Sequence, residues 1–180
     1  MNVALRAAAD RFIYDVAALR TIGDSLEDAE FHAICPAVGR SVLSTFGLLV
    51  SHYRAAALAL KNLRGFAPGS PFELPTIEPT DTASPDEIDK ALAAVVCELL
   101  DALNALPSSN VTPSVTAAVS AWSSVGAHHA LDFLEAVPEL AQDPLLLSWA
   151  VFPVSGEPAG LHDRRIAVLK QARDARKKQR

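Results

Sequence analysis

The stretch "SPDEIDKALAAVVCELLDALNAL", residues 84–106, decides the fold class of this chain. It opens with the serine, proline and glutamate of a capping box, whose side chains satisfy the first backbone N–H groups of a helix. Apolar residues then recur every three or four positions and form one broad stripe, made of Ile88, Leu92, Val95, Val96, Leu99, Leu103 and Leu106. The pattern predicts a helix that buries one face against other helices.

The rest of the chain repeats this kind of signal. Residues 5–23, 36–65 and 112–138 predict three more main helices, short helices begin near residues 25 and 143, and a basic helix begins near residue 161. Residues 65–84 hold four prolines and two glycines and predict an extended connector between two helices that start at the same end of a bundle. No strand-like alternation is found. The prediction is an all-α fold with a four-helix-bundle-like core, additional short helices and a basic C-terminal helix.

Length and composition limit the class of protein. A chain of 180 residues, half of them apolar but only 6% aromatic, favours one domain of closely packed helices. The two cysteines are far apart in sequence, which argues against a secreted disulfide scaffold. Neither a signal-peptide core nor an uncharged apolar run of membrane-spanning length is present. We expect a cytoplasmic protein without membrane insertion.

Charge is distributed unevenly along the chain. Residues 161–180 hold eight Lys/Arg and two acids, a net of +6, whereas residues 1–160 hold eight Lys/Arg and nineteen acids, a net of −11. We therefore divide the chain into an acidic bundle domain, residues 1–160, and a basic helix, residues 161–180. Such segregation is typical of a tail that contacts a protein partner, another copy of the chain or a nucleic-acid backbone, or that docks on the acidic body itself. The predicted partner-binding residues are Arg164, Arg165, Lys170, Arg173, Arg176, Lys177, Lys178 and Arg180.

Two histidines stand together in "GAHHALDFLEAV", residues 126–137. At about 100° per residue, His128, Asp132 and Glu135 share a helical face opposite the apolar side, and His129 lies at the boundary. We expect a solvated face there, with a metal site or an acid–base pair, or contact with a partner, as the alternatives. His52 falls on or beside the buried face of its own helix and is expected to be a hydrogen-bonded core residue.

The same histidines carry a family resemblance. A histidine on an early helix and candidate ligands on a later one resemble the DinB-type metal-binding bundles, which pair the first histidine with His-x-x-x-His or Glu-x-x-x-His. This resemblance implies a divalent metal held by His52 with His128, His129 or Asp132. The chain departs from the motif, because Ser124 and Val125 stand four residues before the two later histidines.

A weaker ligand pattern lies near residue 30. His32 and Cys35 are three residues apart, with Asp28 one turn earlier, so the three side chains could contact one metal ion on a short helix. No phosphate-binding loop, nucleophile elbow or H-E-x-x-H motif is present.

These observations lead to two functional hypotheses. We favour a non-enzymatic interaction or assembly protein whose basic C-terminal helix contacts an acidic surface, either nucleic acid or a protein subunit. The alternative is a DinB-like, metal-dependent enzyme that acts on a small molecule. The sequence leaves open whether the protein is an enzyme.

Overall fold

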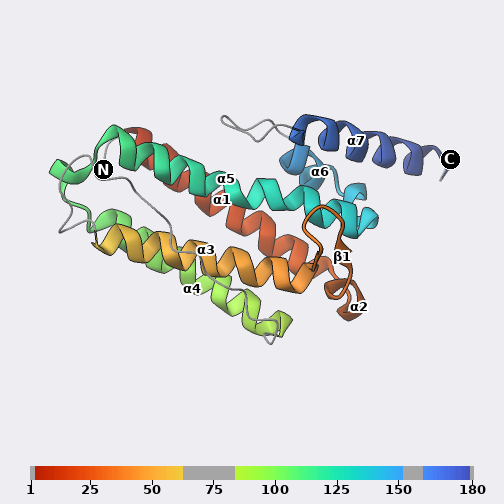
Figure 1. The fold of residues 1–180 in the computed structure, drawn as a ribbon, viewed down its shortest axis with the longest axis horizontal. Helices are drawn as coiled ribbons and strands as arrows, with labels where there is room; N and C mark the ends of the chain where they lie inside the picture. The colour runs from red at the N-terminus through yellow and green to blue at the C-terminus, as the bar shows by residue number, and fades with distance from the viewer. Residues whose placement is uncertain (1–2, 63–83, 152–159, 179–180) are drawn as a thin grey trace.

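The computed structural model describes residues 3–62, 84–151 and 160–178 (Figure 1). Within these ranges the chain is helical almost throughout, which confirms the all-α prediction. The connector predicted over residues 65–84 lies outside the described residues except for Ser84. The elements are α1 (Val3–Ser25), α2 (Asp28–Phe31), β1 (Ile34–Cys35), β2 (Arg40–Ser41), α3 (Val42–Asn62), α4 (Pro85–Asn104), η2 (Ser108–Asn110), α5 (Pro113–Ala136), η3 (Pro138–Gln142), α6 (Pro144–Val151) and α7 (Leu161–Lys178).

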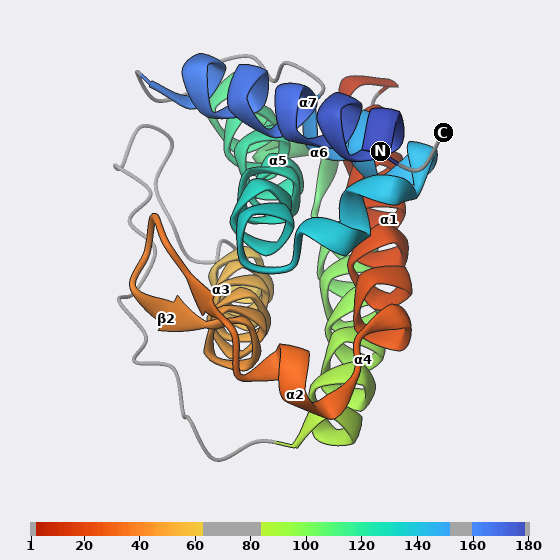
Figure 2. The ribbon, with the colours of Figure 1, turned by 90° about the vertical axis from the view of Figure 1, so that its right-hand side faces the viewer.

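Four long helices form the core of the fold. Helix α1 packs against α5 and α4, and α3 packs against α4 and α5, so the four helices enclose one interior (Figures 1 and 2). Helices α3 and α4 run in the same direction, as expected for two helices joined by a long connector (Figure 1). Aromatic pairs fill the interior: Phe12 meets Tyr53 edge-on at 4.9 Å, and Phe46 stacks on Phe133 at 4.5 Å.

Local capping sets where several helices begin. The Ser84 hydroxyl accepts a hydrogen bond from the Glu87 backbone N–H, and the Glu87 carboxylate accepts one from the Ser84 N–H at 2.8 Å. Thr112 accepts from the Val115 N–H at 3.3 Å, and Asp143 accepts from the Leu145 N–H at 2.8 Å. The predicted starts of α4, α5 and α6 are therefore confirmed.

The segment between α2 and α3 differs from the prediction. A helix was expected from residue 36, but Ile34 and Cys35 pair with Ser41 and Arg40 in a small antiparallel hairpin, and α3 begins only at Val42. Gly39 has a φ of 66°, which a glycine adopts without steric cost and which turns the chain back. The absence of any strand was thus a wrong expectation, because strands of two residues are too short to show alternation.

Helix α7 lies outside the four-helix core. It covers α5, α6 and η3 on the side of the bundle that faces away from α4 (Figures 1 and 2). Its residues Val168 and Ala172 are buried and join the same hydrophobic cluster as the long helices. By its length and its hydropathy, helix α3 could cross a membrane, but 67% of its apolar stretch is buried inside the bundle. A central helix of a packed bundle meets the same two measures, so they assign α3 to neither environment.

Candidate functional site

The histidine-rich stretch of α5 meets the start of α7. The Arg164 guanidinium donates two hydrogen bonds to the Glu135 carboxylate, at 3.0 and 2.9 Å, and a third to Asp132. His129 Nδ1 lies 2.7 Å from the other Asp132 oxygen. Asp132 is only 3% exposed. The expectation of a solvated face is therefore wrong for Asp132, because α5 buries two faces: one against the core and one beneath α7.

Charge balance keeps this cluster ionised. Burial alone would raise the pKa of Asp132, but hydrogen bonds from His129 and Arg164 and their positive charges outweigh it and lower that pKa. Hydrogen bonding to Glu135, opposed by burial and assisted by Asp132, raises the pKa of Arg164. Asp132 therefore stays a carboxylate and Arg164 a cation at neutral pH. The cluster acts as a clamp that holds α7 on α5.

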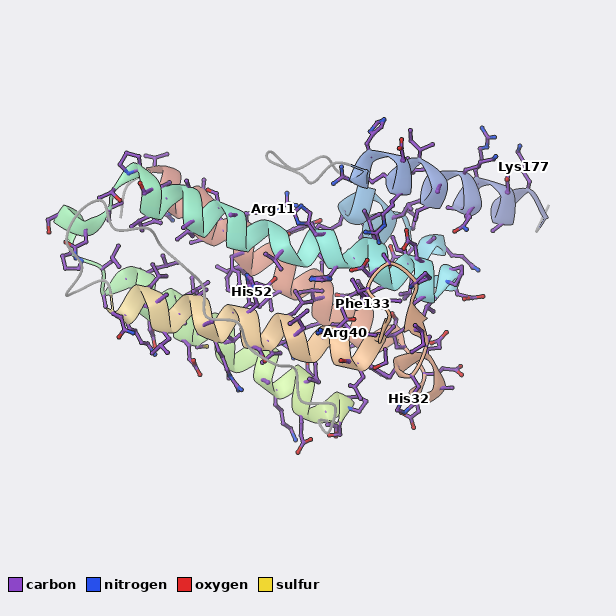
Figure 3. All side chains as sticks on the ribbon, in the orientation of Figure 1. Arg11, His32, Arg40, His52, Phe133 and Lys177 are labelled. Atoms are coloured by element: carbon purple, nitrogen blue, oxygen red, sulfur yellow. The ribbon has the colours of Figure 1, made fainter. Side chains whose placement is uncertain are left out.

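The residues of the metal hypothesis are only partly brought together. His52 is half-buried on the side of α3 that faces α5 (Figure 3). Burial, and then the charge of nearby His129, lowers the pKa of His52. His129 in turn is bonded to Asp132, and His128 is half-buried. Among the residues that the structure describes, no group of three or more His, Cys, Asp or Glu side chains is placed to hold a metal ion.

The second ligand pattern, at His32 and Cys35, does not converge. His32 is exposed at the end of α2 (Figure 3). Cys35 is fully buried beside Thr45, whose Oγ1 lies 3.7 Å from Sγ. Burial, assisted by the charges of Asp132 and Glu135, raises the pKa of the Cys35 thiol to about 11. The thiol is therefore protonated at neutral pH and is a poor ligand and nucleophile.

The eight basic residues predicted to bind a partner fall into three groups. Arg164 bonds to α5 and Arg165 is only 5% exposed, so both turn toward the bundle. Lys170, Arg173 and Lys177 are exposed. The side chains of Arg176, Lys178 and Arg180 lie outside the described residues.

The exposed bases belong to one stripe on the outer side of α7. At about 100° per residue around the helix axis, five residues lie within about 60° of their mean direction: Ile166, Leu169, Lys170, Arg173 and Lys177. Ile166 is 51% and Leu169 42% exposed, and Lys177 points away from the bundle (Figure 3). The stripe begins apolar and becomes basic toward the C-terminus. It is called the outer stripe below.

A buried acid in the core was missed by the sequence analysis. Asp15 of α1 is 0% exposed and accepts hydrogen bonds from Trp149 Nε1 at 2.7 Å and from Arg11 Nε at 2.9 Å. Burial raises its pKa to about 6, although both donors oppose the rise. One sequence signal existed: Asp15 lies three residues after Phe12 and four before Leu19, so it occupies the apolar face of its own helix.

Tyr53 and Gly126 complete the surroundings of Asp15. The Tyr53 ring is fully buried, and burial and the Asp15 charge both raise the pKa of its phenol. A Cβ on Gly126 would lie 2.9 Å from Tyr53 Oη and 3.1 Å from Leu19 Cδ1. Glycine at this position therefore permits the close approach of α5 to α1 and α3 around the buried acid.

No family model, curated protein or solved structure matches this chain.

Proposed function

We propose that this chain is a non-enzymatic interaction protein whose helix α7 binds an acidic surface on a protein subunit. The observation that carries the proposal is the outer stripe, Ile166, Leu169, Lys170, Arg173 and Lys177, which faces away from the bundle. Asp174 lies 3.9 Å from Arg173 and 4.0 Å from Lys177, so three exposed cations of the stripe face one acid on α7 and keep an excess of positive charge. An apolar contact joined to these cations fits a protein surface that is apolar at its centre and acidic at its edge.

The clamp at Arg164 supports this proposal. Three hydrogen bonds to Glu135 and Asp132 fix the start of α7, and buried Val168 and Ala172 hold its inner face. The outer stripe is therefore presented on a helix that is already folded and docked. Binding then costs less conformational entropy than it would for a tail that folds on contact.

Charge favours a protein partner over nucleic acid. Helix α7 packs on the body, and residues 1–160 carry a net charge of −11, so a phosphate backbone that follows α7 would be repelled by that body. The stripe also carries no aromatic side chain on which bases could stack. An acidic protein surface can meet the stripe locally, with apolar contacts adding to the attraction.

The test measures binding of a fluorescein-labelled peptide rich in glutamate and leucine by fluorescence anisotropy. We expect salt-sensitive binding to the wild type that Lys170→Glu/Arg173→Glu weakens by about tenfold or more, because two attractive pairs become repulsive. Arg54→Glu/Lys61→Glu is the matched control, since both residues are exposed bases on α3. Equal binding by the two double variants, or tighter binding of single-stranded DNA than of the peptide, would overturn the proposal.

A further inference from the structure

An acidic groove lies on the opposite side of the bundle from α7. It has a volume of about 250 Å³ and is formed by the C-terminal end of α1, by α2 and by the N-terminal end of α4. Its apolar lining includes Leu19, Phe31, Phe46, Ile88 and Leu92. Leu19 and Phe46 are almost fully buried, so the lining is continuous with the core. All five residues are at most 6% exposed, so the groove has a firmly packed apolar floor of small exposed area, and its charged edge supplies most of the surface that a partner can contact.

Carboxylates surround that floor. Asp24, Asp28, Asp86 and Asp89 line the groove together with one cation, Arg20. Both guanidinium contacts of Arg20 go to Asp89, at 2.5 and 3.0 Å. None of the salt bridges among the described residues includes the other three acids, although the charge of Asp24 helps to raise the pKa of Arg20. The groove thus keeps an excess of negative charge at its edge.

The groove and the outer stripe are complementary in two respects. The stripe offers Ile166 and Leu169 to an apolar floor, and it offers Lys170, Arg173 and Lys177 to acidic edges. When apolar and charged groups match at the same time, they fix the relative position of the two surfaces as well as attracting them. The chain as a whole is polarised in the same sense, with +6 over residues 161–180 and −11 over the rest.

One molecule cannot bring its own two surfaces together. Arg164 holds the start of α7 on α5, and α7 lies on the side of the bundle away from α4 (Figures 1 and 2). The occupant must therefore come from another molecule, and the chain itself supplies a helix of the required chemistry.

We infer that the acidic partner of α7 is a second copy of this chain, whose groove beside Asp24, Asp28 and Asp86 receives the outer stripe. The inference rests on the proposed function and names its partner. The contact is heterologous, since two different surfaces meet. Two molecules form a closed two-fold dimer only if the stripe of each one binds the groove of the other at the same time.

The test is sedimentation velocity of the full-length chain over a range of concentrations and salt. We expect the wild type to self-associate and to dissociate as salt rises. The stripe variant Lys170→Glu/Arg173→Glu and the groove variant Asp24→Lys/Asp86→Lys should each associate at least about tenfold more weakly, because each places like charges on both surfaces. An equimolar mixture of the two variants should associate again, since each then meets a surface of opposite charge.

Two control variants show that net charge is not responsible. Arg54→Glu/Lys61→Glu and Asp10→Lys/Asp101→Lys make the same charge changes at exposed positions outside both surfaces, and both should associate like the wild type. Circular dichroism and thermal melting establish that each variant folds.

The possible results separate this inference from the proposed function. A wild type that stays monomeric while its stripe still binds the acidic peptide overturns the second-copy inference and leaves the proposed function standing. A groove variant that associates like the wild type, or a mixture that fails to associate, overturns the groove as the acceptor. If the acidic peptide binds the stripe variant as tightly as it binds the wild type, both the proposed function and the second-copy inference are overturned.

Discussion

Replacement of Asp15 by asparagine removes a charge from the middle of the bundle. Asp15 is fully buried, and its pKa is raised from 3.8 to about 6, chiefly by burial. A raised pKa means that the folded protein binds the proton more tightly than the unfolded chain does. The stabilising contribution of protonated Asp15 is therefore complete below pH 3.8 and is lost as the pH rises through about 6.

The size of the effect follows from the pKa change. A difference of about two units at about 1.4 kcal/mol per unit amounts to about 3 kcal/mol of unfolding free energy. Asparagine keeps an oxygen that can accept the hydrogen bond from Trp149 and is neutral at every pH. Arg11 Nε donates to the same Asp15 oxygen as Trp149 Nε1, so the variant can keep that hydrogen bond and loses only the ion pair. The ion pair forms only when Asp15 is ionised, so its contribution is already contained in the pKa of about 6, and the Arg11 side chain, 35% exposed, can be hydrated.

We therefore expect Asp15→Asn to gain stability relative to the wild type by about 2.5 kcal/mol between pH 4 and pH 7.5, since part of the change already lies below pH 4. The measurement is urea unfolding, followed by circular dichroism, at several pH values. Asp10→Asn is the control, because Asp10 is exposed on the same helix. The difference in unfolding free energy between variant and wild type isolates Asp15, because the other carboxylates contribute equally to both proteins. Asp132 is one of these, and its lowered pKa makes the protein more stable as the pH rises.

Two results would refute this reasoning. If the stabilities of the variant and the wild type ran parallel from pH 4 to pH 7.5, Asp15 would have the same pKa in both states. If the variant instead lost stability relative to the wild type as the pH rose, Arg11 and Trp149 would outweigh burial and hold Asp15 as a stabilised carboxylate.

Three further substitutions test the structure at other points. Arg164→Met leaves the buried Asp132 carboxylate with His129 but without its guanidinium, and it should cost about 3 kcal/mol in urea unfolding. Arg173→Met, on the exposed stripe, should cost less than about 0.5 kcal/mol, and equal costs would contradict the clamp. Gly126→Ala should lower the melting temperature through a clash worth about 1–3 kcal/mol. Gly23→Ala, with nothing within 4 Å of the added Cβ, should raise the melting temperature or leave it unchanged. An unchanged melting temperature for Gly126→Ala would mean that α5 can move away from α1 and α3 without cost. Ser84→Ala should destabilise the protein by about 1 kcal/mol in thermal melting, and no change would show that the cap is dispensable.

Interactions within a few residues of one another were predictable. The Ser84 capping box and the Thr112 cap each depend on groups three residues apart, so the sequence displays both partners together. The four-helix core followed from the apolar stripes for the same reason. The β1–β2 hairpin was not predictable in this way, because two short strands leave no repeating pattern.

The face of α5 that carries Asp132 shows where such patterns fail. Periodicity identifies an apolar face, and polar residues opposite it are assigned to solvent. Here Arg164, thirty-two residues further along the chain, covers that face and supplies the hydrogen bonds that allow Asp132 to be buried. A charged side chain can be buried only where a partner supplies hydrogen bonds and opposite charge, and that partner can lie at any distance along the sequence.

The sequence by itself determined the all-α class, the starts of α4, α5 and α6 and the separation of an acidic body from a basic C-terminal helix. Tertiary structure alone decided which charges are buried. It placed Asp15 against Trp149 across the core and divided the bases of α7 between the clamp and the outer stripe. The physical reason is that helix formation is governed by neighbours along the chain, whereas desolvation of a charge is governed by whatever elements fold over it.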